Sequence, residues 1–353
     1  MCPRRGVLRR LFFPLVALGA VAGLMFIAAP AHSAGDAVFG INDDNAFRHH
    51  YRGSARLLAG LGNVHVGVWT SPEDHSFWPI PQSRPVLVQL LGSPDWASRP
   101  AAYAAAALRL VRAHPNIREL QVWNEPDLCW FPCAPNGDGF RFREGYVDQY
   151  LDLLAATHAA LAGTGVKVLG FGFSYRVDEK WSPEDITHAI RSWYNRRGGR
   201  TFVGVGREDG EWISVRFGGH AYPFPIMDGF AYHPYCGWES ATTDRIYAAL
   251  DQLQLPGGTP RLWWTESGFD TESRHGGYFG VSGGIARCSH GSEAEQAARV
   301  QQVMQEARTS PYVAGAFNFL LYDERDLSRW QTGLVRPDGS PKPAFGVFAR
   351  AVG

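Results

Sequence analysis

The stretch IRELQVWNEP, Ile117 to Pro126, decides the fold of this chain. Its first seven residues form a short, mostly apolar run typical of a buried β-strand. Pro126 then forces the chain out of the strand, directly after Asn124 and Glu125. A strand that ends in such a polar pair is expected where parallel strands bring their carboxyl ends to one face, because catalytic residues gather there.

The same pattern recurs along the chain. Eight runs are predicted to be strands: Val38–Ile41, Val64–Trp69, Val86–Leu91, Ile117–Trp123, Val166–Phe173, Gly229–His233, Leu262–Glu266 and Val313–Leu320. Amphipathic stretches between them predict helices over Phe47–Leu61, Ala101–Ala113, Tyr146–Leu161, Ile186–Tyr194, Asp244–Leu253, Ala294–Thr309 and Pro343–Ala351. Eight strands with intervening helices, at about forty residues per unit, predict the α/β class and a single-domain (β/α)8 TIM barrel.

Two regions depart from this alternation. Gly198–Met227 is rich in Gly and aromatic residues and is expected to be an inserted hairpin or long loop, and Thr271–His290 a second long loop. Both are expected near the catalytic face. A doubly wound sheet is the alternative fold, but no G-x-G-x-x-G opens a helix after the first strand.

The composition excludes several functions. The 353 residues include 34 Lys+Arg and 34 Asp+Glu, and no basic run follows the amino-terminal segment, so nothing favours binding to nucleic acid. The chain is 45% hydrophobic and 13% aromatic, which excludes a disordered protein. Its 12 Trp, 21 Phe and 13 Tyr exceed the usual need of a core, so we expect some of them to line a cleft.

The amino terminus predicts export. Arg4, Arg5, Arg9 and Arg10 precede an apolar run, and a small-x-small site ends at Ala34. This is the pattern of a signal peptide over residues 1–34, followed by a catalytic domain over 35–353. The protein is therefore expected to be secreted, extracellular and free of the membrane after cleavage, by the Sec or the twin-arginine route. An uncleaved membrane anchor is the alternative.

The cysteines agree with an oxidising compartment. Four follow the leader, Cys129, Cys133, Cys236 and Cys288, and an even count predicts two disulfides with three possible pairings. We favour Cys129–Cys133 and Cys236–Cys288. No CxxC or His-x3-His pattern lies nearby, so neither a metal nor another cofactor is expected.

The chemistry concentrates where the predicted strands end. Glu125 follows the fourth strand and Glu266 ends the seventh, so the two carboxylates should converge across one mouth of the barrel. Glycoside hydrolysis needs two such groups, one a neutral acid and the other an ionised nucleophile. Their environments must therefore hold their pKa values apart.

These motifs resemble the clan of retaining (β/α)8 glycosidases that includes families 5 and 39. Asn124-Glu125-Pro126 and Trp264–Gly268 carry the resemblance, and Leu91–Ser98, Phe230–Tyr235 and Asp338–Phe345 support it in the same order. The resemblance implies cleavage of O-glycosidic bonds of an oligo- or polysaccharide by double displacement. It implies that Glu125 is the general acid/base and Glu266 the nucleophile.

The resemblance assigns further roles. Asn124 would bind the substrate 2-hydroxyl, while His233 and Tyr235 would orient the carboxylates. Trp96, Trp264 and Asn318 are predicted to contact substrate, although core packing is an equal alternative for Trp264. The loop residues Trp130, Trp238 and Trp330 are further candidates for sugar stacking.

Two positions depart from the clan. His65 lies near the place of a strand-two arginine that supports the nucleophile, and Asn318 lies where a strand-eight tryptophan is common. A transglycosylase and a non-catalytic carbohydrate-binding barrel therefore remain alternatives. In each case the expected partner is a carbohydrate, and the chain is expected to be a monomer.

Overall fold

The protein is described by a computed structural model over residues 36–74, 79–126, 144–173, 183–197, 215–217, 220–222, 226–235, 239–253, 258–271, 291–327 and 329–353. The predicted signal peptide and all four mature cysteines lie outside these residues, as do Trp130 and Trp238. The cleavage site and the disulfides therefore stay predictions.

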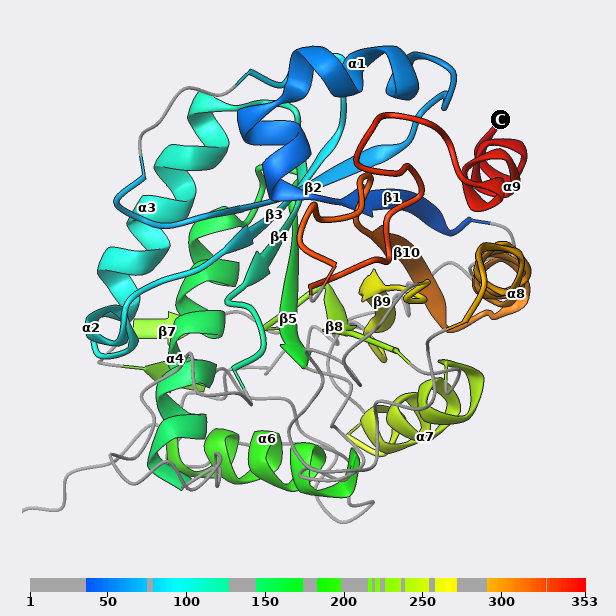
Figure 1. Ribbon diagram of the computed structural model, residues 1–353. Helices are drawn as coiled ribbons and strands as arrows, with labels where there is room; N and C mark the ends of the chain where they lie inside the picture. Colours follow the sequence, from blue (N-terminus) through cyan, green and yellow to red (C-terminus); the bar gives the residue numbers. More distant parts are fainter. Residues whose placement is uncertain are drawn as a thin grey trace, which may run out of the picture. The chain divides into compact units, whose positions relative to one another are not determined.

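Eight parallel strands close into a barrel in the order β1-β10-β9-β8-β5-β4-β3-β2 (Figure 1). Their bounds are β1 Val38–Asn42, β2 His65–Thr70, β3 Val86–Leu90, β4 Ile117–Val122, β5 Lys167–Phe173, β8 Gly229–Tyr232, β9 Arg261–Ser267 and β10 Val313–Phe319. The predicted (β/α)8 barrel is confirmed. A separate antiparallel pair, β6 Val215–Phe217 with β7 His220–Tyr222, makes a hairpin of the segment before the sixth barrel strand.

Helices surround the barrel (Figure 1). They are η1 Asn45–His49, α1 Tyr51–Ala59, α2 Pro94–Ala97, α3 Pro100–Ala113, α4 Glu144–Leu161, α6 Pro183–Arg197, α7 Glu239–Asp251, α8 Glu293–Thr309 and α9 Pro343–Val352. Local sequence sets several of their starts. Pro100 and Pro343 lie in first turns, where a missing N–H costs nothing. Ser292 and Glu295 form a capping box at the start of α8. In the described part of the chain, no helix is long and apolar enough to cross a membrane.

The barrel interior is filled by large side chains set against glycines. A Cβ on Gly229 or Gly315 would come within 2.5 Å of the Trp263 indole, so only glycine leaves room for that ring. Trp263 packs with Leu87, Leu169 and Phe317 in an inner cluster. A larger outer cluster, which includes Leu120 and Val122 of β4, packs between the strands and the helices. The barrel is thus a packed core, and the space for a ligand lies at its carboxyl-terminal mouth.

Candidate active site

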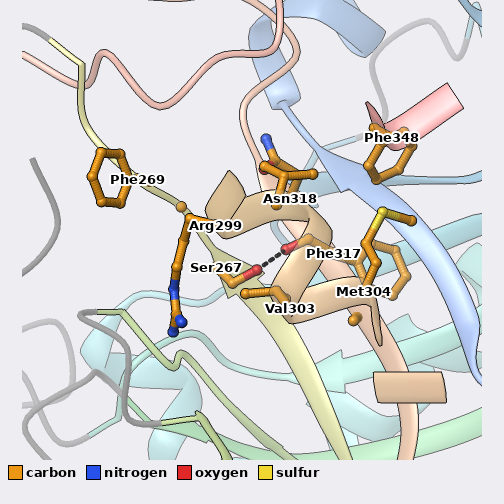
Figure 2. A pocket seen from close by; sticks show the side chains of 11 residues that line it. Ser267, Phe269, Arg299, Val303, Met304, Phe317, Asn318 and Phe348 are labelled. Carbon is orange, nitrogen blue, oxygen red and sulfur yellow. Dashed lines mark hydrogen bonds between the residues drawn. The ribbon is translucent and has the colours of Figure 1, made fainter. Parts of the chain in front are cut away.

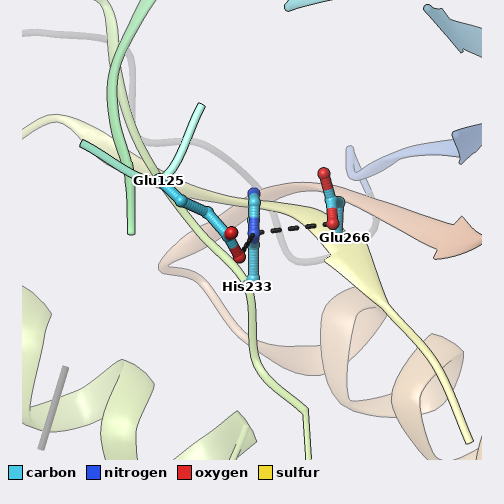
Figure 3. A group of neighbouring side chains, drawn as sticks. All are labelled: Glu125, His233 and Glu266. Carbon is cyan, nitrogen blue, oxygen red and sulfur yellow. Dashed lines mark hydrogen bonds and ion pairs between the residues drawn. The ribbon is translucent and has the colours of Figure 1, made fainter. Parts of the chain in front are cut away.

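Glu125 and Glu266 meet at the carboxyl-terminal mouth of the barrel. Glu266 lies near the end of β9 and is 4% exposed, and Glu125 follows β4 with 17% of its side chain exposed. One oxygen of each carboxylate and Nδ1 of His233 all lie within 4.8 Å of one another (Figure 3). The two carboxylates therefore converge at one mouth of the barrel, as the sequence analysis expected.

Unusual backbone conformations place Glu125. Trp123 and Glu125 have φ values of 67° and 44°, the left-handed region that costs energy for residues other than glycine. The turn is fixed because the Trp123 ring is buried and the Glu125 amide donates to the carbonyl of Gly172 at 2.9 Å. Pro126 follows Glu125 and prevents the chain from continuing as a strand. The strain is therefore concentrated where the acid/base candidate must leave the strand and face the mouth.

Neutral donors hold the carboxylate of Glu266. Tyr235 Oη donates to Oε2 at 3.0 Å, Gln89 Nε2 donates to Oε1 at 3.1 Å, and Asn42 Nδ2 lies 3.5 Å from Oε1. Burial raises the pKa of Glu266 above its ordinary value, and the negative charge of Glu125 adds to that effect. His233 and the donors Gln89 and Tyr235 act in the opposite direction.

His233 lies between the two carboxylates (Figure 3). Its Nδ1 is 3.0 Å from Glu125 Oε1 and 3.6 Å from Glu266 Oε2, and its side chain is fully buried. An imidazole nitrogen can donate to an ionised carboxylate or accept from a protonated one. The position of His233 therefore suits a pair of acids that exchange protonation states during a reaction.

The same three side chains form a group that could hold a metal ion. The hydrogen bonds that they make to one another, to Tyr235 and to Gln89 already satisfy both carboxylate oxygens of Glu266. These contacts account for the arrangement by hydrogen bonding alone, and the prediction that no metal is needed stays a prediction.

Asn124 contacts two further amides that the sequence analysis missed. Its Oδ1 accepts from Gln89 Nε2 at 3.1 Å and from Gln121 Nε2 at 3.3 Å. Gln89 and Gln121 were detectable as polar residues inside apolar strands, and Asn42 as the polar end of the first strand. What the sequence lacked was the register that brings the three strands together.

An aromatic wall adjoins Glu266. It consists of Trp69 at the end of β2, Tyr235, Phe319 at the end of β10, and Trp330 from the loop after β10. The Tyr235 and Trp330 rings lie 5.5 Å apart at 32°, and Trp69 stacks on Phe319 at 6.2 Å. Trp330 is partly exposed, so it remains a candidate for contact with a sugar.

Two predicted substrate contacts need correction. Trp264 is 1% exposed and packs in the outer cluster, where its Nε1 donates to Thr243 of α7 at 3.2 Å. Asn318 lines a small pocket between β9, β10 and the helices α8 and α9 (Figure 2). Its Nδ2 donates to the carbonyls of Leu320 and Thr332 at 2.9 and 3.3 Å, so it supports the loop after β10. The adjacent Phe319 faces the mouth instead.

Trp96 and His65 lie elsewhere. Trp96 is in α2, after β3, where its indole N–H bonds Glu73 and the Arg99 guanidinium lies 4.4 Å over its ring. Its contact with sugar stays a prediction. His65 begins β2, at the opposite end of the barrel from Glu266, and its Nδ1 pairs with Glu119 at 2.8 Å. It does not support the nucleophile candidate.

Comparison with solved structures gives proteins of similar fold. A family 39 glycoside hydrolase from Bacteroides cellulosilyticus WH2 matches 89% of this chain and 63% of its own, with 15% identity and a TM-score of 0.56. A β-glucuronidase from Ruminococcus gnavus, solved with D-glucuronic acid, matches 91% and 50%, with 13% identity and a TM-score of 0.51. A GH5_18 protein from Streptomyces cattleya, solved with GlcNAc, matches 91% and 80%, with 17% identity and a TM-score of 0.55.

This chain therefore spans 63% of the family 39 protein, 50% of the β-glucuronidase and 80% of the GH5_18 protein. At these identities the likeness establishes a shared barrel fold. No family model and no curated protein sequence matches the chain.

Proposed function

We propose that this chain is a retaining glycoside hydrolase that cleaves O-glycosidic bonds of an oligo- or polysaccharide. The observation that carries the proposal is the carboxylate pair of Glu125 and Glu266, with oxygens within 4.8 Å. Retaining enzymes hold their two carboxyl groups about 5–5.5 Å apart, whereas inverting enzymes leave about 6.5–9.5 Å for a water. The glycosidase barrels of similar fold support the same reaction class.

In the first step of the proposed mechanism, Glu266 attacks the anomeric carbon while Glu125 protonates the departing glycosidic oxygen. The bond from Glu266 to carbon forms as the carbon–oxygen bond breaks, which gives a covalent glycosyl-enzyme. Glu266 must be ionised for this step, and the donors Tyr235 and Gln89 stabilise its charge. Glu125, now ionised, can accept from His233 Nδ1.

In the second step, Glu125 takes a proton from water, and the hydroxide attacks the same carbon from the side that the leaving group vacated. The bond to Glu266 breaks, and the sugar is released with its original configuration. Trp330 and the rest of the aromatic wall would pack on the sugar beside Glu266. Asn124 would bind the 2-hydroxyl. The mature chain, residues 35–353, is proposed to act outside the cell as a monomer with two disulfides.

A labelling experiment tests the proposal. The mature protein is screened on 4-nitrophenyl glycosides of both anomers and on plant and bacterial polysaccharides. The glycoside that is cleaved is then supplied in its 2-deoxy-2-fluoro form with a dinitrophenyl leaving group, which forms the glycosyl-enzyme but releases it slowly. We expect one added glycosyl mass on the peptide that contains Glu266, and none in the Glu266→Gln protein.

The outcomes separate the alternatives. A label on another residue would refute the assignment of Glu266, and a protein that binds sugar without turnover or label would be a non-catalytic barrel. Transfer of the sugar to an added acceptor in preference to water would identify a transglycosylase. Release of sugar with inverted configuration would refute retention.

A further inference from the structure

Gln89 joins the two halves of the candidate site. This β3 side chain is fully buried, and its Nε2 donates to Glu266 Oε1 and to Asn124 Oδ1, each at 3.1 Å. Its Oε1 accepts from Asn42 Nδ2 at 3.1 Å. The two N–H groups of one amide therefore hold the nucleophile candidate and the candidate 2-hydroxyl ligand in a fixed relation.

The contacts of Asn124 decide what it can offer a sugar. Its Oδ1 accepts from both Gln89 and Gln121, so both lone pairs of the carbonyl oxygen are used within the protein. The group left to face a ligand is the Nδ2 amide, which donates. A donor in this place binds a hydroxyl through its oxygen. The orientation of Asn124 thus depends on the glutamines behind it.

The surroundings of Glu266 also depend on Gln89. A Cβ on Gly67 of β2 would lie 2.9 Å from Cγ and Oδ1 of Asn42, so the Asn42 side chain occupies the space that a β2 side chain would need. Among the described residues, Gln89, Asn42 and Tyr235 are the hydrogen-bond donors to Glu266, and all three are neutral. Neutral donors stabilise a carboxylate less than a guanidinium does.

We propose that Gln89 is a positioning residue that acts on both reacting partners, because it stabilises the ionised Glu266 and fixes Asn124 as a donor to the substrate 2-hydroxyl. This inference rests on the proposed function and adds to it a residue that couples nucleophile and substrate recognition.

The test uses Gln89→Met, which keeps length and removes both N–H donors. Two quantities are measured with the aryl glycoside that the wild-type protein cleaves: the acid limb of the pH profile of kcat/KM, and the ratio of kcat/KM for that glycoside to its 2-deoxy counterpart. We expect the acid limb to rise by about one pH unit, because an ionised acceptor loses a hydrogen bond. We expect the 2-hydroxyl preference to fall about tenfold.

Two matched variants separate the two roles. Gln121→Met removes the donor to Asn124 Oδ1 and to the Trp123 carbonyl but no donor to Glu266, so the 2-hydroxyl preference should fall while the acid limb stays in place. Tyr235→Phe removes a donor to Glu266 and leaves the bonds from Gln89 and Gln121 to Asn124, so the acid limb should rise while the preference is kept. A residue with a merely structural role would lower kcat/KM without moving either quantity. Circular dichroism establishes that each variant is folded.

If Gln89→Met does not fold, the isosteric Gln89→Glu replaces it. A second carboxyl beside Glu266 should raise the acid limb further, and the 2-hydroxyl preference should still fall. A Gln89 variant that leaves the acid limb in place, or that behaves as Gln121→Met does, overturns the inference. A wild-type protein that neither cleaves glycosides nor becomes labelled at Glu266 refutes instead the proposed function.

Discussion

The Lys342→Met substitution should lower the free energy of unfolding more at pH 8 than at pH 5. The Lys342 side chain is 1% exposed, and its Nζ contacts both oxygens of Asp323 at 2.7 and 2.8 Å. It also donates to Thr271 Oγ1 at 2.9 Å and to the carbonyl of Gln331 at 3.2 Å. The substitution would leave a buried carboxylate without its cation, and breaking such a pair costs about 3–5 kcal/mol.

The pH dependence follows from the remaining carboxylate. Burial raises the pKa of Asp323 to about 6 even with Lys342 present, and the variant should raise it further. A raised carboxylate pKa favours the folded state below the ordinary value near 3.9, and this contribution is lost as the pH rises through the folded-state pKa. If the substitution raises the pKa of Asp323 from about 6 to about 7, the loss of stability at pH 8 grows by about 1.4 kcal/mol, whereas the loss at pH 5 hardly changes.

Urea unfolding followed by circular dichroism measures both values. The control is Arg329→Met, which removes the exposed pair with Glu324 and should cost less than about 1 kcal/mol at either pH. Other groups that titrate in this range are shared with the wild-type protein and cancel in the difference. An equal loss at pH 5 and pH 8, or a loss below about 1 kcal/mol at pH 8, would refute this account of the pair.

Four further results are expected. Glu125→Ala should lose about 10²–10⁴-fold on natural glycosides but less on dinitrophenyl glycosides, and azide should restore turnover as the glycosyl azide of retained configuration. The wild-type acid limb should lie above pH 4.3, an ordinary glutamate pKa, because burial raises the pKa of Glu266 and only its ionised form attacks; a limb at or below that pH would contradict this. Gly172→Ala should lower kcat/KM, because a Cβ would lie 2.1 Å from Gln121 Nε2 and displace the amide that donates to Asn124, whereas Gly163→Ala, also at positive φ, has open space and should cost only about 1–2 kcal/mol in stability. Mass and thiol analysis of the secreted protein should give a start near residue 35 and no free thiol; a retained leader or a free cysteine would contradict it.

The barrel was predictable because parallel strands covered by helices are apolar on both faces. The predicted Gly229–His233 run and the observed Gly229–Tyr232 strand differ by one residue. The convergence of Glu125, His233 and Glu266 followed from the rule that strand ends share one mouth. Gln89 was not predictable in the same way. Its role depends on which residues of neighbouring strands lie side by side, and the sequence of one strand does not contain that register.

An irregularity between β9 and β10 explains how Trp264 and Glu266, both on β9, come to face different sides of the sheet. Ala316 of β10 pairs with Trp264 of β9, and Asn318 of β10 pairs with Ser267 of β9. Between these pairs β10 advances by two residues and β9 by three, so β9 holds one extra residue there. Trp264 faces the helices, and Glu266, two positions on, should face them too in a regular strand. The bulge instead turns Glu266 toward Gln89 and Tyr235 in the mouth. The bulge in β9 is therefore what presents the nucleophile candidate to the site.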